Sequence, residues 1–239
     1  MLVHLEDLRT ALFNDTKHGI FDGDTDVVLP FVDMGFLGED VDGIRILKKL
    51  ERIIRVAYKS EDSITENSHE RLVNLILKNG HESTLEHVNL TTLITTNRGV
   101  SHEWVRHRIA AYTQESTRYV NYKKKAGTII YPAWINDKPD WFKREWYEQQ
   151  NRSLRTYCEW VDKEGEYRLT PQEARDILPN GLKTEFVVTK NLRSLRNFFG
   201  LRLPPTAHPD MRVVSTEYFK QLHAKIPLIF DGLLDIAEK

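Results

Sequence analysis

The sequence is poor in cysteine, the residue that forms disulfides in extracellular proteins and that binds many metal ions. A single cysteine, Cys158, stands among 239 residues, which excludes an internal disulfide framework and any metal site built on several cysteines. The 34 basic and 35 acidic residues nearly cancel, so no overall field draws the protein to nucleic acid or to a membrane. No stretch approaches the roughly 18 to 20 apolar residues of a membrane span. We expect an unprocessed cytoplasmic protein that binds any anion through a local cluster.

The composition, 40% hydrophobic and 10% aromatic, predicts a folded globular protein. Scattered glycines and acids in residues 1–40 predict an irregular or weakly stranded opening of no assigned role. Helical spacing, capping residues and prolines predict helices at 44–58, around 72–77, from about Ser101, at 139–162 (one helix or a pair), at 171–178, from Asn191 through Phe199 to an end at Gly200, and from Pro209. Strands are predicted at 88–96, 128–131 and 182–190. This irregular alternation, without repeats or linkers, predicts one α+β domain over residues 1–239.

The densest cluster of anion-binding groups runs from Trp104 to Tyr119. It contains Arg106-His107-Arg108, then seven residues, then Ser116-Thr117-Arg118-Tyr119. Arginine presents a planar fork of donors that matches phosphate oxygens, and a serine hydroxyl adds a further donor. By itself such a run also fits a solvated basic helix face, so composition alone leaves both readings open.

This segment resembles the signature of the flavin-dependent thymidylate synthases, in which Arg-His-Arg, seven unspecified residues and Ser continue into Arg-Tyr. Three further blocks resemble the same family in matching order, between about residues 80 and 212. They are Gly80 to His87, Pro171 to Pro179 and Asn191 to Arg202. The resemblance implies a mainly antiparallel sheet flanked by helices.

The first of these blocks, Gly80 to His87, also invites comparison with zinc proteases, because His81-Glu82 begins their motif. That motif needs its second histidine four residues on, where Leu85 stands. His81 and His87 are six residues apart, about 240° around an α-helix, and we expect no metal. Without the resemblance, local capping or hydrogen bonding within the core would explain these histidines equally well.

The resemblance assigns roles to individual residues. It implies that Arg202 contacts the pyrimidine ring and favours its ionised form. It implies flavin contacts for His81, Ser83, Glu86, Arg106, His107, Arg108, Gln114, Asn191, Arg193 and Asn197. It implies substrate contacts for Glu103, Trp104, Arg106, Gln114, Glu115, Ser116, Thr117, Arg118, Arg175 and Arg202.

Two departures from the family pattern stand out. Gln114 occupies a position where many members have Glu, and Glu103 one where many have Gln, so the pair looks exchanged. The segment from Leu203 to Ala207 lengthens the loop before His208, to which we assign no role.

The family resemblance implies an enzyme that converts deoxyuridylate (dUMP) to thymidylate (dTMP). Methylenetetrahydrofolate supplies the carbon, and FAD reduced by NADPH supplies the hydride, in a homotetramer with shared active sites. No cysteine nucleophile is involved, and Cys158 matches none of the blocks, which favours a structural thiol. Two other readings stay open: a nucleic-acid-binding module that interleaves arginines with aromatics, and an inactive relative that keeps the fold.

Overall fold

The structure, a computed structural model, describes residues 25–38, 40–125 and 127–237. Its described residues divide into two compact units. Unit 1 holds 25–31, 95–104 and 114–186, and unit 2 holds 32–94, 105–113 and 187–237, apart from the undescribed 39 and 126. Residues 1–24 of the expected irregular opening lie outside the described residues, and two short strands follow them. The single domain over residues 1–239 stays a prediction.

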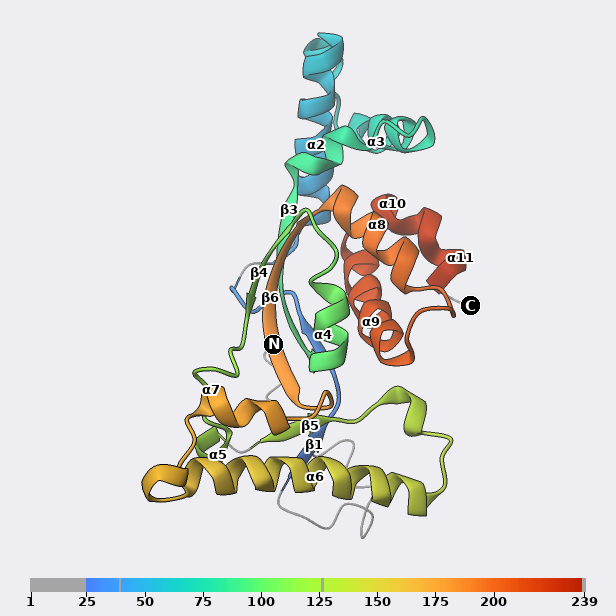
Figure 1. Cartoon of the computed structure of the whole chain (residues 1–239). Coiled ribbons are helices and arrows are strands. Elements are labelled where there is room, and N and C mark those ends of the chain that lie inside the picture. Colours follow the sequence, from blue (N-terminus) through green and yellow to red (C-terminus); the bar gives the residue numbers. More distant parts are fainter. Residues whose placement is uncertain (1–24, 39, 126, 238–239) are drawn as a thin grey trace. The chain divides into compact units, whose positions relative to one another are not determined.

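The elements follow the predicted order closely (Figure 1). The helices are α2 (Gly43–Tyr58), α3 (Ser68–Lys78), α4 (Arg98–Trp104), α5 (Tyr122–Lys125), α6 (Asp140–Asp162), α7 (Pro171–Ala174), α8 (Leu192–Arg202), α9 (Pro209–Lys225), α10 (Pro227–Phe230) and α11 (Leu234–Ala237). The strands are β1 (Asp26–Val28), β2 (Phe31–Asp33), β3 (Asn89–Asn97), β4 (Ala110–Gln114), β5 (Thr128–Ile130) and β6 (Lys183–Asn191). Short 3₁₀ turns are η1 (Glu61–Ser63), η2 (Glu82–His87), η3 (Ala133–Ile135), η4 (Gly165–Tyr167), η5 (Arg175–Ile177) and η6 (Asp231–Leu233).

The strands form a four-stranded sheet in the order β2-β3-β6-β4 and a two-stranded sheet of β1 and β5. Strands β3 and β6 are antiparallel, because Leu192 N–H donates to the Val88 carbonyl while Thr91 and Thr189 share a hydroxyl hydrogen bond. Between these two contacts the residue number rises along β3, from 88 to 91, and falls along β6, from 192 to 189, so the strands run in opposite directions. Strands β1 and β5 are parallel. The prediction of an α+β fold with a mainly antiparallel sheet is confirmed.

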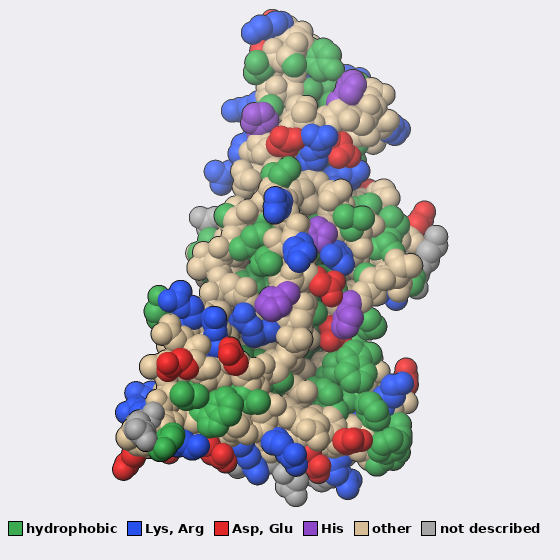
Figure 2. Space-filling model, viewed as in Figure 1, with side chains coloured by type: hydrophobic (Ala, Val, Ile, Leu, Met, Phe, Trp, Pro, Cys, Tyr) green, Lys and Arg blue, Asp and Glu red, His purple; other side chains and the backbone are tan. Residues whose placement is uncertain are grey.

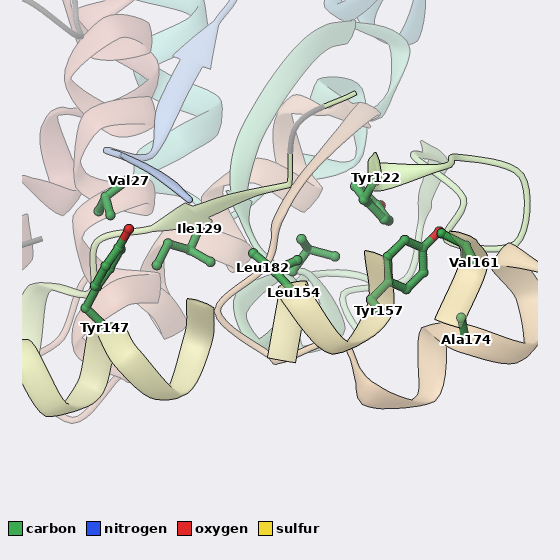
Figure 3. Packing of buried hydrophobic residues seen from close by; sticks show 9 residues of the cluster. All are labelled: Val27, Tyr122, Ile129, Tyr147, Leu154, Tyr157, Val161, Ala174 and Leu182. Carbon is green, nitrogen blue, oxygen red and sulfur yellow. The ribbon is translucent and has the colours of Figure 1, made fainter. Parts of the chain in front are cut away.

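The core of unit 1 forms along one face of α6. Its buried residues include Tyr147, Leu154 and Val161, spaced two helical turns apart. Figure 3 shows Val27 of β1 and Ile129 of β5 beside this face. Residues 140–162 thus form one continuous helix, which selects the first of the two predicted alternatives.

In unit 2 a buried ion pair joins α2 to the chain that leads into α3. Glu51 and Arg55, 2% and 7% exposed, pair over 2.9 Å one turn apart. The Ser68 hydroxyl donates to the same Glu51 oxygen over 2.6 Å, and Arg55 donates to the Ser63 carbonyl over 3.0 Å. Each charge is therefore compensated by a partner and further hydrogen bonds, as buried charges require.

The start of α2 packs directly on the end of α9. Asp42 caps α2 by accepting from Arg45 N–H. A Cβ atom added to Gly43 would lie 1.9 Å from the Lys225 carbonyl oxygen. Only glycine allows the two backbones to approach so closely.

We therefore expect Gly43→Ala to lower the free energy of unfolding by about 1–3 kcal/mol, because the helix backbones must separate. Gly200→Ala is the matched control, since nothing lies within 4 Å of its added Cβ within α8. There alanine should stabilise by about 0.5–1 kcal/mol through helix propensity. Urea denaturation of both variants checks this, and equal midpoints for Gly43→Ala and the unmodified protein would contradict the packing described.

Two predicted helix boundaries were wrong. Helix α4 begins at Arg98, because the Asn97 side chain accepts from Val100 N–H and so takes the capping role expected of Ser101. Helix α8 does not end at Gly200 but continues through Arg202, which lies in its last turn rather than beyond it. Strand β4 had not been predicted at all.

Candidate active site

The residues predicted to bind flavin and those predicted to bind nucleotide separate almost completely between the two units. Unit 2 contains the flavin set apart from Gln114: His81, Ser83, Glu86, Arg106, His107, Arg108, Asn191, Arg193 and Asn197. Unit 1 contains the nucleotide set apart from Arg106 and Arg202: Glu103, Trp104, Gln114, Glu115, Ser116, Thr117, Arg118 and Arg175.

His107 is the most fully engaged of the predicted residues in unit 2. Arg202 Nε donates to His107 Nε2 over 2.8 Å, although 95 residues separate them in sequence. Because arginine can only donate, Nε2 carries a lone pair and the neutral ring holds its proton at Nδ1. The ring also packs edge-to-face on Phe198, with centroids 5.0 Å apart. The fold thus brings the first arginine motif and the end of α8 together.

The charge state of His107 follows from its surroundings. Burial, and then the charges of Arg202 and Lys190, lower its pKa to about 4. The imidazole is therefore neutral near pH 7 and offers a donor at Nδ1. The positive charge of this cluster comes from the arginines and the lysine.

Lys190 belongs to this cluster and was not among the predicted site residues. Its side chain is 1% exposed, and its Nζ donates to the His107 carbonyl over 3.0 Å and to Ser194 Oγ over 3.3 Å. The ammonium lies 5.8 Å and 5.9 Å from the ring centroids of Tyr112 and Phe198. Burial lowers the pKa of Lys190 to about 8. No described carboxylate pairs with it.

The loop from Arg106 to Arg108 contains His107 at its centre, and the side chains of both arginines are exposed. Ile109, directly after it, has φ of +62° and is 76% exposed. This left-handed conformation is a genuine outlier for a β-branched residue. Such strain concentrates at sites that bind ligands.

The family block around η2 pairs with α8 through two ion pairs in unit 2. Glu86 pairs with Arg193, so two residues of the predicted flavin set are brought together, and both are about half exposed. Glu82 pairs with Arg196 over 3.0 Å. Figure 2 shows acidic and basic side chains interspersed where Figure 1 draws η2 and the start of α8.

The predicted geometry of His81 and His87 needs correction. Residues 82–87 form a 3₁₀ helix rather than an α-helix, with His81 at its start. Three residues per turn place residues six apart on the same face, yet two turns separate them by about 12 Å. The two imidazoles are therefore kept apart by helical rise rather than by the 240° expected. Within the described ranges, no group of three or more His, Cys, Asp or Glu is placed to hold a metal ion.

The predicted cap of α8 is confirmed, since Asn191 Oδ1 accepts from Ser194 N–H over 2.8 Å. Its Nδ2 donates to none of the described residues. Arg193 and Asn197 lie one turn apart on the same face of α8, and both are exposed. His208 has the same kind of role as Asn191, accepting from Asp210 N–H at the start of α9.

In unit 1, Gln114 and Glu115 at the end of β4 take part in internal hydrogen bonds. Gln114 Nε2 donates to Ser101 Oγ over 2.9 Å and to Thr184 Oγ1 over 3.1 Å. Glu115 accepts from the Tyr122 hydroxyl over 2.9 Å. The orientation of Gln114 is thus set by two hydroxyl groups.

A turn follows β4 and contains three more of the residues predicted to bind the nucleotide, Ser116, Thr117 and Arg118. Ser116 Oγ accepts from Arg118 N–H over 3.3 Å, and the Ser116 carbonyl accepts from Val120 N–H. Thr117 is buried, whereas the exposed Arg118 guanidinium lies 5.4 Å from the Tyr119 ring centroid. The turn therefore carries an exposed guanidinium at Arg118 and a hydroxyl at Ser116.

Three other predicted substrate residues lie elsewhere in unit 1. Arg175 is exposed at the start of η5, and Glu103 lies partly buried on α4. Trp104 is fully buried and packs edge-to-face on Phe186, with centroids 5.5 Å apart. Its role in binding substrate stays a prediction.

The donor set of unit 2 fits an anionic cofactor. The exposed guanidinium groups of Arg106 and Arg108 flank a neutral histidine, and neither forms an ion pair with a carboxylate in the part of the chain that the structure describes. Flavin dinucleotides carry two phosphates, which such donors bind.

Comparison with known proteins places most of the chain in one family. The model of the family described as thymidylate synthase complementing protein matches residues 45–228. Curated proteins named flavin-dependent thymidylate synthase are similar. That of Pyrococcus furiosus is 35% identical over 167 residues, 69% of this chain and 66% of the relative. That of Pyrococcus horikoshii is 40% identical over 164 residues, 67% of this chain and 65% of the relative.

A third such protein, from Sulfolobus acidocaldarius, is 31% identical over 191 residues, 75% of this chain and 71% of the relative. The chain spans just under two thirds of the Pyrococcus relatives it matches. All four sequence blocks lie within the matched residues 45–228. The chain therefore belongs to the family of thymidylate synthase complementing proteins.

Proposed function

We propose that the chain is a flavin-dependent thymidylate synthase. It would methylate dUMP reductively to dTMP, with methylenetetrahydrofolate as carbon donor. The observation that carries the proposal is the hydrogen bond between Arg202 and His107, which joins two family motifs 95 residues apart. FAD, reduced by NADPH, would supply the hydride when bound.

In this proposal unit 2 carries the cofactor residues. Arg106 and Arg108 would bind the anionic cofactor, and the ion-paired Arg193 with Asn197 would extend that surface along α8. His107 would hold its proton at Nδ1 and donate it in a hydrogen bond. The neutral ring supports this role, since burial and neighbouring cations lower its pKa to about 4.

In the same proposal, unit 1 carries most of the residues that would bind the nucleotide. Arg118 and Arg175, with the Ser116 hydroxyl, would bind the phosphate of dUMP. Arg202 would polarise the pyrimidine ring where negative charge develops. Gln114, fixed by Ser101 and Thr184, would present its carbonyl oxygen to a ligand.

Cys158 is a poor candidate for a nucleophile. It is partly buried against the α6 core cluster, and burial raises the pKa of its thiol. A raised pKa lowers the fraction of the thiol that is ionised at neutral pH, and only the ionised thiolate is a good nucleophile. This supports ring activation by charge rather than by covalent attack.

The proposal extends to assembly and compartment. The family resemblance implies shared active sites in a homotetramer, whereas the single cysteine favours a cytoplasmic location. None of the helices among the described residues is both long and apolar enough to cross a membrane.

The protein reconstituted with FAD should show flavin absorption that changes when dUMP is added. It should form dTMP from methylenetetrahydrofolate only when NADPH is present. Cys158→Ala should retain this activity, since the thiol takes no part. A protein that cannot be reconstituted with FAD would defeat the proposal, and would favour an inactive or nucleic-acid-binding relative.

A further inference from the structure

Lys190 occupies a position where the strand pattern calls for an apolar residue. Strand β6 alternates, and the buried face continues from Phe186 and Val188 to Lys190. Lysine is almost never fully buried unless it is paired. Lys190 is 1% exposed, and no carboxylate of the described residues pairs with it. Stability alone does not account for it, because an apolar side chain of similar size would avoid the cost of burying the charge.

The ammonium fixes the backbone of one residue in particular. The His107 carbonyl accepts from Lys190 Nζ over 3.0 Å and from the Tyr112 hydroxyl over 2.7 Å. Burial raises the pKa of Tyr112 to about 12, so the phenol stays a donor near neutral pH. The ring of the same histidine is held by Arg202. Backbone and side chain of His107 are thus fixed independently.

Fixing His107 also fixes the residues on either side of it. Arg106 and Arg108 are its chain neighbours, and the strained Ile109 follows. The His107 carbonyl belongs to the peptide bond that enters Arg108, so its donors restrict rotation of the backbone that leads to the strained Ile109. The directions in which the two arginines extend therefore depend on the donors at that carbonyl.

We propose that Lys190 is a positioning residue, whose buried ammonium holds the Arg106–Arg108 loop in the conformation that presents both arginines to an anionic cofactor. Lys190 does not touch the cofactor in this proposal. It acts through the His107 carbonyl and adds positive charge behind the loop. Its effect on flavin rests on the proposed function, whereas its effect on the loop does not.

The first test is amide hydrogen exchange in the unliganded protein. Lys190→Met keeps the length of the side chain and removes charge and donors. Exchange at residues 106–109 should become about 10-fold faster or more, because a hydrogen bond to a charged group is lost. Lys183→Met, on the same strand, is the matched control and should leave that loop unchanged. Unchanged exchange in Lys190→Met would overturn the proposal.

A second variant covers the case in which Lys190→Met unfolds more easily overall. Tyr112→Phe keeps the aromatic ring and removes only the other donor to the His107 carbonyl. It should speed exchange at the same residues, while exchange in α9 stays as in the unmodified protein. Equal protection of the loop with and without the hydroxyl would count against a role for this carbonyl.

Flavin titration supplies the functional readout. Lys190→Met should bind FAD about 10-fold more weakly or worse, with Lys183→Met unaffected. Equal FAD affinity in Lys190→Met and the unmodified protein would overturn the positioning role. If the unmodified protein binds no FAD, the proposed function fails, and hydrogen exchange alone still decides whether Lys190 holds the loop.

Discussion

Arg202→Ala should retain bound FAD yet form dTMP about 100- to 1,000-fold more slowly, the usual effect of removing one donor aimed at developing charge. Arg202 sits at the end of α8 and donates to His107 Nε2. Its loss removes the cation proposed to polarise the pyrimidine and frees the imidazole. Flavin absorbance and the rate of dTMP formation, measured on the same sample, separate binding from turnover.

Leu201→Ala is the matched control for Arg202→Ala. Leu201 is the neighbouring residue of the same helix end and is 57% exposed. Truncation there changes α8 locally without touching the His107 cluster, so turnover should stay close to that of the unmodified protein. Full turnover by Arg202→Ala would sink the assignment of Arg202, and equal losses in both variants would point to helix fraying instead.

Glu51→Leu should lower the free energy of unfolding by about 3–5 kcal/mol, the largest stability effect that we expect. The substitution leaves the Arg55 guanidinium buried without its carboxylate, and an uncompensated buried charge is costly. The Ser68 hydroxyl loses its acceptor as well. Chemical denaturation at a fixed protein concentration measures the change.

The double variant Glu51→Leu with Arg55→Met separates two explanations. If the cost comes from the orphaned charge, removing Arg55 as well should recover much of the lost stability. If it comes from poor packing at α2, the second substitution should lower stability further. The second result would show that the ion pair is not what holds this part of unit 2.

Local signals in the sequence predicted local structure well. Asn191 caps α8, and Thr170 with Glu173 forms the capping box of α7, because such contacts span only three residues. Where two local signals competed, the prediction was wrong. Asn97 and Ser101 are both good caps, and hydrogen bonding at the end of β3 selects Asn97. Glycine at 200 favours a helix end, but Leu203 N–H still donates to the Phe199 carbonyl.

Structure that depends on distant residues was less accessible from the sequence. The residues of β4, Ala110 to Gln114, lack a clear apolar alternation, and the strand forms because β6 pairs with it. The contact between His107 and Arg202 crosses 95 residues, and no periodicity predicts it. The alternation of β6 does contain a signal for Lys190, because a lysine stands in register with buried apolar residues.

Ile109 has a consequence for the energetics of ligand binding. A β-branched residue at φ of +62° carries a conformational cost of about 1–3 kcal/mol, which folding has already met. The unliganded loop is thus preorganised, and an anion that reaches Arg106 and Arg108 need not order the backbone between them. Less of the interaction energy is then lost to entropy on binding. Folding stability and ligand affinity at this loop are therefore opposed. A substitution that relaxes the backbone at residue 109 would raise the free energy of unfolding and weaken binding of the anion.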